Sequence, residues 1–109
     1  MEAAAQEQRR AVTTDYIIDE TATLLRARGL TKLLAEFFRL TEASQALTIE
    51  WISPDRFAAA RKFMLKHLDQ EFSFTDCVSF VVMKELRLTE ALATDNHFRI
   101  AGFNPLLAD

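Results

Sequence analysis

The sequence predicts an α/β fold, a three-layer sandwich in which helices cover a parallel sheet. Short segments rich in β-branched and aromatic residues, which indicate strands, alternate with longer amphipathic segments, which indicate helices. Strands that alternate with helices favour parallel pairing through right-handed crossovers. In such folds functional groups collect at the carboxyl ends of strands and at the neighbouring helix N-termini.

The first elements are bounded by clear local signals. A short strand is expected over residues 11–14 and a helix over residues 15–28. Thr14 is a suitable N-cap for this helix, and Gly29 is a suitable residue just past its end. A second helix with a wide apolar face is expected over residues 31–43.

The helix over residues 15–28 carries one acidic residue at the border of its apolar side. At about 100° per residue its apolar side chains form one continuous arc, made up of Leu24, Ile17, Thr21, Leu25, Ile18 and Ala22. Glu20 lies about 40° beyond the edge of this arc, whereas Asp19 points away from it. We therefore expect Glu20 to lie against the protein and Asp19 to be solvated.

The middle of the chain predicts a strand followed by a helix. Residues 47–52 alternate and include β-branched and aromatic side chains, which is typical of a strand. Ser53 and Pro54 then suit the N-cap and first position of a helix. This helix should continue to about Leu68, with an inner stripe of Phe57, Ala60, Met64 and Leu68.

A further helix should begin at Ser73 and lie mostly in the core. Its body, residues 77–83, is apolar almost all round, which indicates burial on most sides. Ser73 and Asp76 have the spacing of a capping box. A last short strand is expected over residues 90–94, with Asp95 at its end.

Four carboxylates are expected at one edge of this sheet. Asp15 and Asp76 start helices, Asp95 ends a strand, and Glu20 lies little more than one turn into its helix. Converging carboxylates are the ligands that a metal-dependent nuclease needs for Mg²⁺. Each also has an ordinary structural role: Asp15 and Asp76 favour helix N-termini, Glu20 suits a solvated rim, and Asp95 suits a turn.

Composition predicts one domain covering residues 1–109. Half of the residues are hydrophobic and 27% are charged, as in a soluble globular protein. No segment resembles a signal peptide or could span a bilayer, and the lone Cys77 lies within an apolar helix. We therefore expect a cytoplasmic protein with no membrane partner and with Cys77 as a core residue.

The net charge excludes one class of nucleic-acid binder. A formal charge of -3 argues against a general coat protein for nucleic acids, which needs a basic surface. It does not exclude an enzyme that cuts RNA, because a carboxylate cluster that binds Mg²⁺ is itself acidic.

Three segments together resemble a known family. They are T-T-D-Y-I-I-D-E (13–20), S-F-T-D-C-V-S-F (73–80) and A-T-D-N-H-F-R-I-A-G-F (93–103). In this order they resemble the PIN domain of VapC-type toxin ribonucleases, and the similarity covers essentially the whole chain. The resemblance implies a PIN-like α/β/α sandwich and a metal-dependent endoribonuclease from a toxin–antitoxin pair.

The resemblance also implies roles for individual residues. Glu20, Asp76 and Asp95 would be the catalytic residues and ligands of Mg²⁺ or Mn²⁺. Around them would lie Ser79, one turn on from Asp76, with Asp15 and His97. RNA would be the substrate, an antitoxin protein a possible partner, and a homodimer the expected assembly.

One family feature has no counterpart in this sequence. PIN domains open with a central strand that ends in an aspartate, usually within D-T-S, whereas residues 1–9 here read as the end of a helix. The expected domain is therefore incomplete at its N-terminus and lacks that strand and that aspartate. Three explanations stay open: the true start lies upstream of Met1, the chain is a degenerate remnant, or strand exchange with a second copy or another protein completes the sheet. The alternative hypothesis is an inactive PIN remnant that acts as a protein-binding or dimerisation module.

Overall fold

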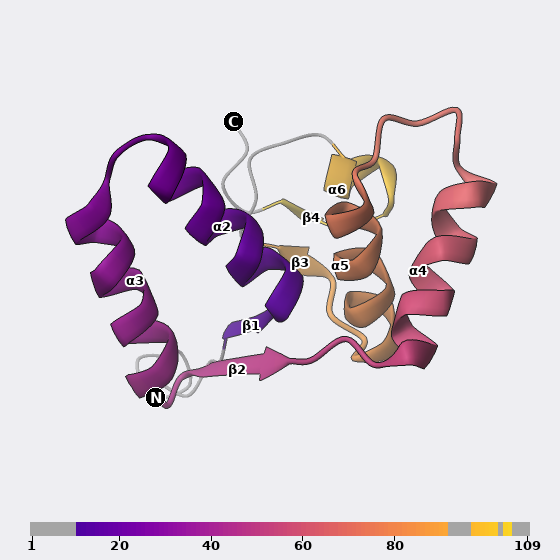
Figure 1. The fold of residues 1–109 in the computed structure, drawn as a ribbon. Helices are drawn as coiled ribbons and strands as arrows, with labels where there is room; N and C mark the ends of the chain where they lie inside the picture. The colour runs from indigo at the N-terminus through magenta and orange to yellow at the C-terminus, as the bar shows by residue number, and fades with distance from the viewer. Residues whose placement is uncertain (1–10, 92–96, 103, 106–109) are drawn as a thin grey trace. The chain divides into compact units, whose positions relative to one another are not determined.

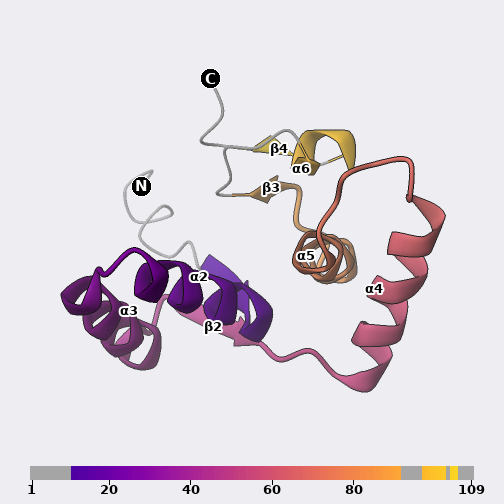
Figure 2. The ribbon, with the colours of Figure 1, turned by 45° about the horizontal axis from the view of Figure 1, so that its top comes forward.

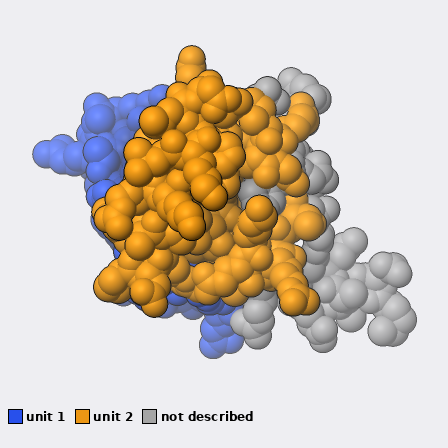
Figure 3. All heavy atoms as spheres, turned by 90° about the vertical axis from the view of Figure 1, so that its right-hand side faces the viewer, with its two compact units in different colours: residues 1–51 blue, residues 52–109 orange. Residues whose placement is uncertain are grey.

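The computed structural model describes residues 11–91, 97–102 and 104–105. The chain divides into two compact units, Met1–Trp51 and Ile52–Asp109, which are coloured separately in Figure 3. Within the described ranges, no helix is both long enough and apolar enough to cross a membrane.

In its described residues, the first unit combines two parallel strands with two helices (Figure 1). Its elements are β1 (Ala11–Thr14), α2 (Asp15–Ala27), α3 (Thr31–Ala43) and β2 (Leu47–Glu50). Strands β1 and β2 are parallel, with their residues paired in order from Ala11 opposite Leu47 to Thr14 opposite Glu50. The predicted parallel pairing is confirmed for these two strands, and β2 ends earlier than expected.

Helix α2 has the predicted ends. The Thr14 side chain accepts a hydrogen bond from the backbone N–H of Ile17 at 3.2 Å, which satisfies one of the free donors at the helix start. Gly29 follows the C-cap Arg28 with φ of +72°, a left-handed conformation that glycine adopts without steric cost.

The apolar faces of α2 and α3 remain largely open to solvent. The two helices pack against each other, yet neither contains a buried residue. Five apolar side chains of this unit are exposed on or between these helices: Leu24, Leu30, Leu33, Phe38 and Leu40. The amphipathic patterns therefore predicted the helices correctly, but a buried core beneath them is not formed by the described residues of this unit.

The second unit is built on two neighbouring helices. Helices α4 (Pro54–Lys66) and α5 (Phe74–Glu85) lie side by side (Figure 2), followed by β3 (Glu90–Ala91), α6 (His97–Ile100) and β4 (Asn104–Pro105). Strands β3 and β4 pair in parallel. The predicted strand over residues 90–94 is confirmed at its first two positions, and its remainder lies outside the described residues.

Helix α5 forms the core of this unit, as its sequence predicted. Its body is buried at Cys77, Val78, Ser79, Phe80, Val82 and Met83. The Phe80 ring lies 5.0 Å from Phe72 and 5.7 Å from Phe63, measured between centroids. Cys77 is the predicted core residue, and burial, with a smaller contribution from the Asp76 charge, raises the pKa of its thiol.

The predicted inner stripe of α4 was wrong at its C-terminal end. Ala60 is fully buried, and the Phe57 ring, though 40% exposed, lies 5.0 Å from the Phe74 ring of α5, but Leu68 is 69% exposed. Leu68 falls outside the stripe because the helix ends at Lys66 and His67 is its C-cap, so the helical spacing does not extend to it. Phe63 supplies the contact with the α5 core instead.

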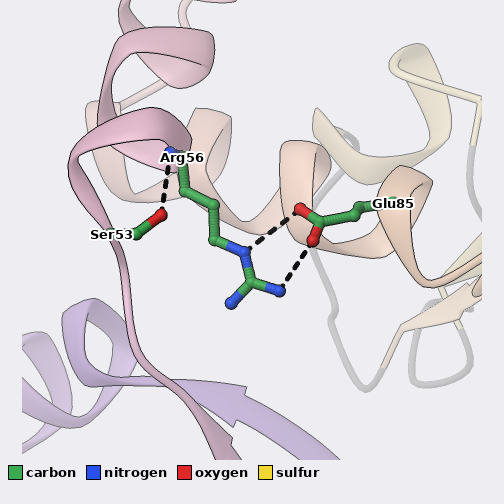
Figure 4. Close-up of polar contacts among 3 residues, drawn as sticks. All are labelled: Ser53, Arg56 and Glu85. Atoms are coloured by element: carbon green, nitrogen blue, oxygen red, sulfur yellow. Dashed lines mark hydrogen bonds and ion pairs between the residues drawn. The ribbon is translucent and has the colours of Figure 1, made fainter.

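An ion pair joins the two helices at the start of α4 (Figure 4). Ser53 caps the helix by accepting the Arg56 backbone N–H at 3.2 Å, and the Arg56 guanidinium reaches Glu85 on α5. Its Nε donates to Oε2 at 3.1 Å and its Nη2 donates to Oε1 at 2.9 Å. This two-point contact holds the pKa of Glu85 below its usual range, chiefly through the hydrogen bond.

The pair should make stability depend on pH in the acidic range. The folded-state pKa of Glu85 is lowered, so the ionised carboxylate stabilises the folded state. This stabilisation is fully present above the unfolded-state pKa and is lost as pH falls through the folded-state pKa. Glu85→Gln should therefore lower the thermal midpoint at pH 7 but not at pH 3. Glu42→Gln, which removes an exposed carboxylate with no ion pair among the described residues, is the control. A Glu85→Gln effect of equal size at both pH values would contradict this prediction.

Candidate metal-binding site around Asp76

Asp76 is held at the start of α5 by the predicted capping box. Ser73 Oγ accepts the Asp76 backbone N–H at 3.0 Å, and the Ser73 backbone N–H donates to Asp76 Oδ2 at 3.0 Å. Two donors at the helix start are thus satisfied reciprocally. The ordinary structural role of Asp76 is therefore confirmed, and it uses only one of the two carboxylate oxygens.

His97, the first residue of α6, contacts the same carboxylate oxygen. Its Nδ1 lies 2.9 Å from Asp76 Oδ2, across 21 positions of sequence. An ionised carboxylate only accepts hydrogen bonds, so the histidine must carry its hydrogen on Nδ1. The side chains are 33% exposed for His97 and 17% exposed for Asp76, so the pair is partly shielded from water.

The buried Phe72 ring packs against His97. Phe72 is 6% exposed, and its ring meets the His97 ring edge-on, with 5.6 Å between centroids and 79° between planes. Phe72 also meets Phe80 nearly edge-on at 5.0 Å. The imidazole therefore contacts an aromatic cluster on one side and the carboxylate through Nδ1.

The second oxygen of Asp76 suits a hard cation. Among the described residues, Oδ1 accepts no hydrogen bond, whereas Oδ2 accepts two. Carboxylate oxygens are the preferred ligands of Mg²⁺, and ligating carboxylates are commonly held by further hydrogen bonds. The donor set at Asp76 therefore fits such an ion.

Ser79 lies on the same helix as Asp76, three residues further on. This spacing places the two residues on one side of α5. Ser79 is 8% exposed, so it is a buried polar residue next to the Asp76 turn. The predicted proximity of Ser79 to Asp76 is consistent with this placement.

The expected contrast between Glu20 and Asp19 was wrong. Both residues of α2 are exposed, although only Asp19 was expected to be. The reason is that no residue of α2 is fully buried, so the rim of its apolar arc is open to solvent, although the arc itself is half-buried except at Leu24. Asp15 lies in the first turn of α2, where a negative charge favours the helix dipole.

The meeting of three carboxylates stays a prediction. Glu20 belongs to the first unit, Asp76 belongs to the second, and Asp95 lies outside the described residues. Within the described part of the chain, no three His, Cys, Asp or Glu side chains are grouped closely enough to hold a metal ion. Of the three predicted ligands, the structure describes Glu20 and Asp76, and it shows supporting side-chain contacts for Asp76.

The contact between His97 and Asp76 was not identified from the sequence. His97 was expected near the predicted metal ligands, but nothing in the spacing named its hydrogen-bond partner. The available signal was the capping box, which predicts that Asp76 has one oxygen turned toward its own helix start.

Comparisons with known proteins agree with these features. The family model for the PIN domain matches residues 1–104. A protein from two strains of Mycobacterium tuberculosis, CDC 1551 / Oshkosh and ATCC 25618 / H37Rv, is 32% identical over 94 residues, covering 84% of this chain and 70% of the relative. That relative is the 23S rRNA-specific endonuclease VapC20.

The crystal structure of Mycobacterium tuberculosis VapC20, a Sarcin-Ricin loop cleaving toxin, has a similar fold. The TM-score is 0.80 at 29% sequence identity, and the match covers 86% of this chain and 72% of that chain. This similarity confirms the predicted α/β fold of helices and parallel strands. The chain therefore belongs to the PIN domain family and is a VapC-like member of it.

Proposed function

We propose that this chain is a divalent-metal-dependent endoribonuclease that hydrolyses RNA phosphodiesters, as the toxin of a toxin–antitoxin pair. The observation that carries the proposal is the Asp76 carboxylate, whose Oδ2 is held by Ser73 and His97 while Oδ1 accepts no hydrogen bond from any described residue. The relationship to the endonuclease VapC20 supports this reading over the alternative of an inactive binding module.

In this proposal the acidic residues act together. Glu20, Asp76 and Asp95 hold Mg²⁺ or Mn²⁺, which activates water and neutralises charge on the scissile phosphate. The carboxylate of Asp76 needs little rearrangement to accept the cation, because two hydrogen bonds to Oδ2 already hold it in place. The shielding of Asp76 strengthens its attraction to a cation compared with a fully solvated carboxylate.

The test is cleavage of RNA by the 109-residue chain with and without Mn²⁺. Activity should require the added metal and should be lost with EDTA. Glu20→Gln should lower the cleavage rate by at least about 100-fold, because a metal site supplies several kcal/mol of transition-state stabilisation. Asp19→Asn removes the neighbouring exposed charge of the same helix and is the matched control.

Two outcomes would contradict the proposal. Cleavage that does not need added metal would contradict the metal-dependent mechanism, and no cleavage at any Mn²⁺ concentration would favour the binding module. Equal losses in Glu20→Gln and Asp19→Asn would show a general effect of charge on α2 and would remove Glu20 from the site.

Protein partners follow from the same family membership. We propose that an antitoxin and a second copy of the chain are the partners, and the exposed apolar side chains of α2 and α3 are compatible with such contacts. Sedimentation at increasing protein concentration tests the second copy. A monomer at all concentrations would leave the antitoxin as the proposed protein partner.

A further inference from the structure

We propose that His97 is a positioning residue that orients the Asp76 carboxylate so that Oδ1 alone faces the cation. The inference rests on the proposed function, since it concerns how the same site binds its metal. It assigns to His97 a role in metal affinity without direct contact with the metal or the RNA.

The hydrogen-bond capacity of one oxygen supports this assignment. A carboxylate oxygen has two lone-pair positions, and Oδ2 of Asp76 accepts two donors, the Ser73 N–H at 3.0 Å and His97 Nδ1 at 2.9 Å. No lone pair of Oδ2 then remains for a cation. Asp76 should therefore bind a metal through Oδ1 only, as a monodentate ligand.

The two donors restrain the carboxylate in different ways. The rotation of an aspartate carboxyl group about its last bond is broad, so one hydrogen bond does not define its plane. Ser73 holds Oδ2 from the same helix turn, whereas His97 holds it from α6. Two donors from separate elements fix the plane and hence the direction in which Oδ1 points.

The imidazole is itself held in place. Phe72 is buried and meets the His97 ring edge-on at 5.6 Å. The contact between His97 and Asp76 therefore links the metal ligand to a rigid aromatic cluster. Loss of the Nδ1 donor should release the carboxylate while the cluster stays largely packed.

The experiment compares two substitutions at His97. His97→Leu removes the donor, whereas His97→Asn places an amide N–H close to the position of Nδ1 and should restore the contact. The matched control is His67→Leu. His67 also lies beside Phe72, with 6.3 Å between ring centroids, but its Nδ1 bonds to the Phe63 carbonyl at 2.8 Å and not to Asp76.

Mn²⁺ affinity, measured by calorimetry or by the spectrum of free Mn²⁺, is the first readout. His97→Leu should weaken binding by about 10–100-fold, the usual effect of losing a hydrogen bond to a metal ligand. His97→Asn should bind within about threefold of the unsubstituted chain, and His67→Leu should bind normally. At saturating Mn²⁺ and RNA, His97→Leu should recover much of its cleavage rate, because the ligands are still present.

Asp76→Asn separates this inference from the proposed function. If Asp76→Asn loses Mn²⁺ binding while His97→Leu does not, Asp76 is a ligand but His97 does not position it. If His97→Leu and His67→Leu lose affinity equally, the effect belongs to the aromatic cluster and the positioning role is wrong. Normal Mn²⁺ binding by Asp76→Asn would overturn both the inference and the metal site.

Discussion

Asp76→Asn should lower metal-dependent RNA cleavage by at least about 100-fold while changing the fold very little. The amide oxygen of asparagine can still accept the Ser73 N–H, so the hydrogen bond of the capping box survives. The negative charge that attracts a cation is lost, and the amide NH2 group, which cannot ligate Mg²⁺, takes the place of Oδ1. Cleavage rate, Mn²⁺ affinity and circular dichroism together measure these effects.

The matched control for this prediction is Asp55→Asn. Asp55 lies in the first turn of α4 and is exposed, so its substitution also removes a negative charge from a helix start. We expect full activity from this variant. Asp76→Ala should lose activity as Asp76→Asn does, but it should also lose stability because it lacks the acceptor for the cap. Cleavage by Asp76→Asn at the unsubstituted rate would show that Asp76 has only its structural role.

Phe80→Ala should destabilise the second unit by about 3–5 kcal/mol. Phe80 is 1% exposed and contacts the rings of Phe63 and Phe72, so truncation removes apolar burial and leaves a cavity in a packed cluster. This loss is a large part of the roughly 5–15 kcal/mol that stabilises a typical domain. Urea unfolding followed by circular dichroism measures the change.

The control for this prediction is Leu68→Ala in the same unit. Leu68 is 69% exposed, so its substitution should change the free energy of unfolding by less than about 0.5 kcal/mol. The contact of Phe72 with His97 also predicts weaker Mn²⁺ binding in Phe80→Ala well below its unfolding temperature. Equal stability losses in the two variants would mean that the aromatic cluster is not the core of this unit.

Most of the local structure could be predicted from the sequence. The caps at Thr14, Ser53 and Ser73 were each identified from residue type and spacing, and each side chain accepts the expected backbone N–H. These contacts join residues three positions apart, so their geometry follows from the start of the helix itself. The burial of α5 was equally predictable because its body is apolar on nearly every side.

The candidate site could be predicted only in part. Asp76 was identified both as a capping residue and, through the family resemblance, as a metal ligand. The exposure of Glu20 could not be predicted, because an amphipathic pattern shows which side of a helix is apolar but not whether another element covers it. The stripe of α4 failed at Leu68 for a similar reason, since the helix ended before it.

The sequence by itself determined helices α2 to α5, the caps at their starts where a side chain caps them, the parallel α/β class and the membership of the PIN family. Only the tertiary structure decided that His97 and Ser73 share one oxygen of Asp76, while the other accepts no hydrogen bond within the described part of the chain. The physical reason is how far apart in the sequence the contacting residues lie. A cap is formed within one helical turn, whereas the His97 contact spans 21 positions and exists only when α6 packs against α5.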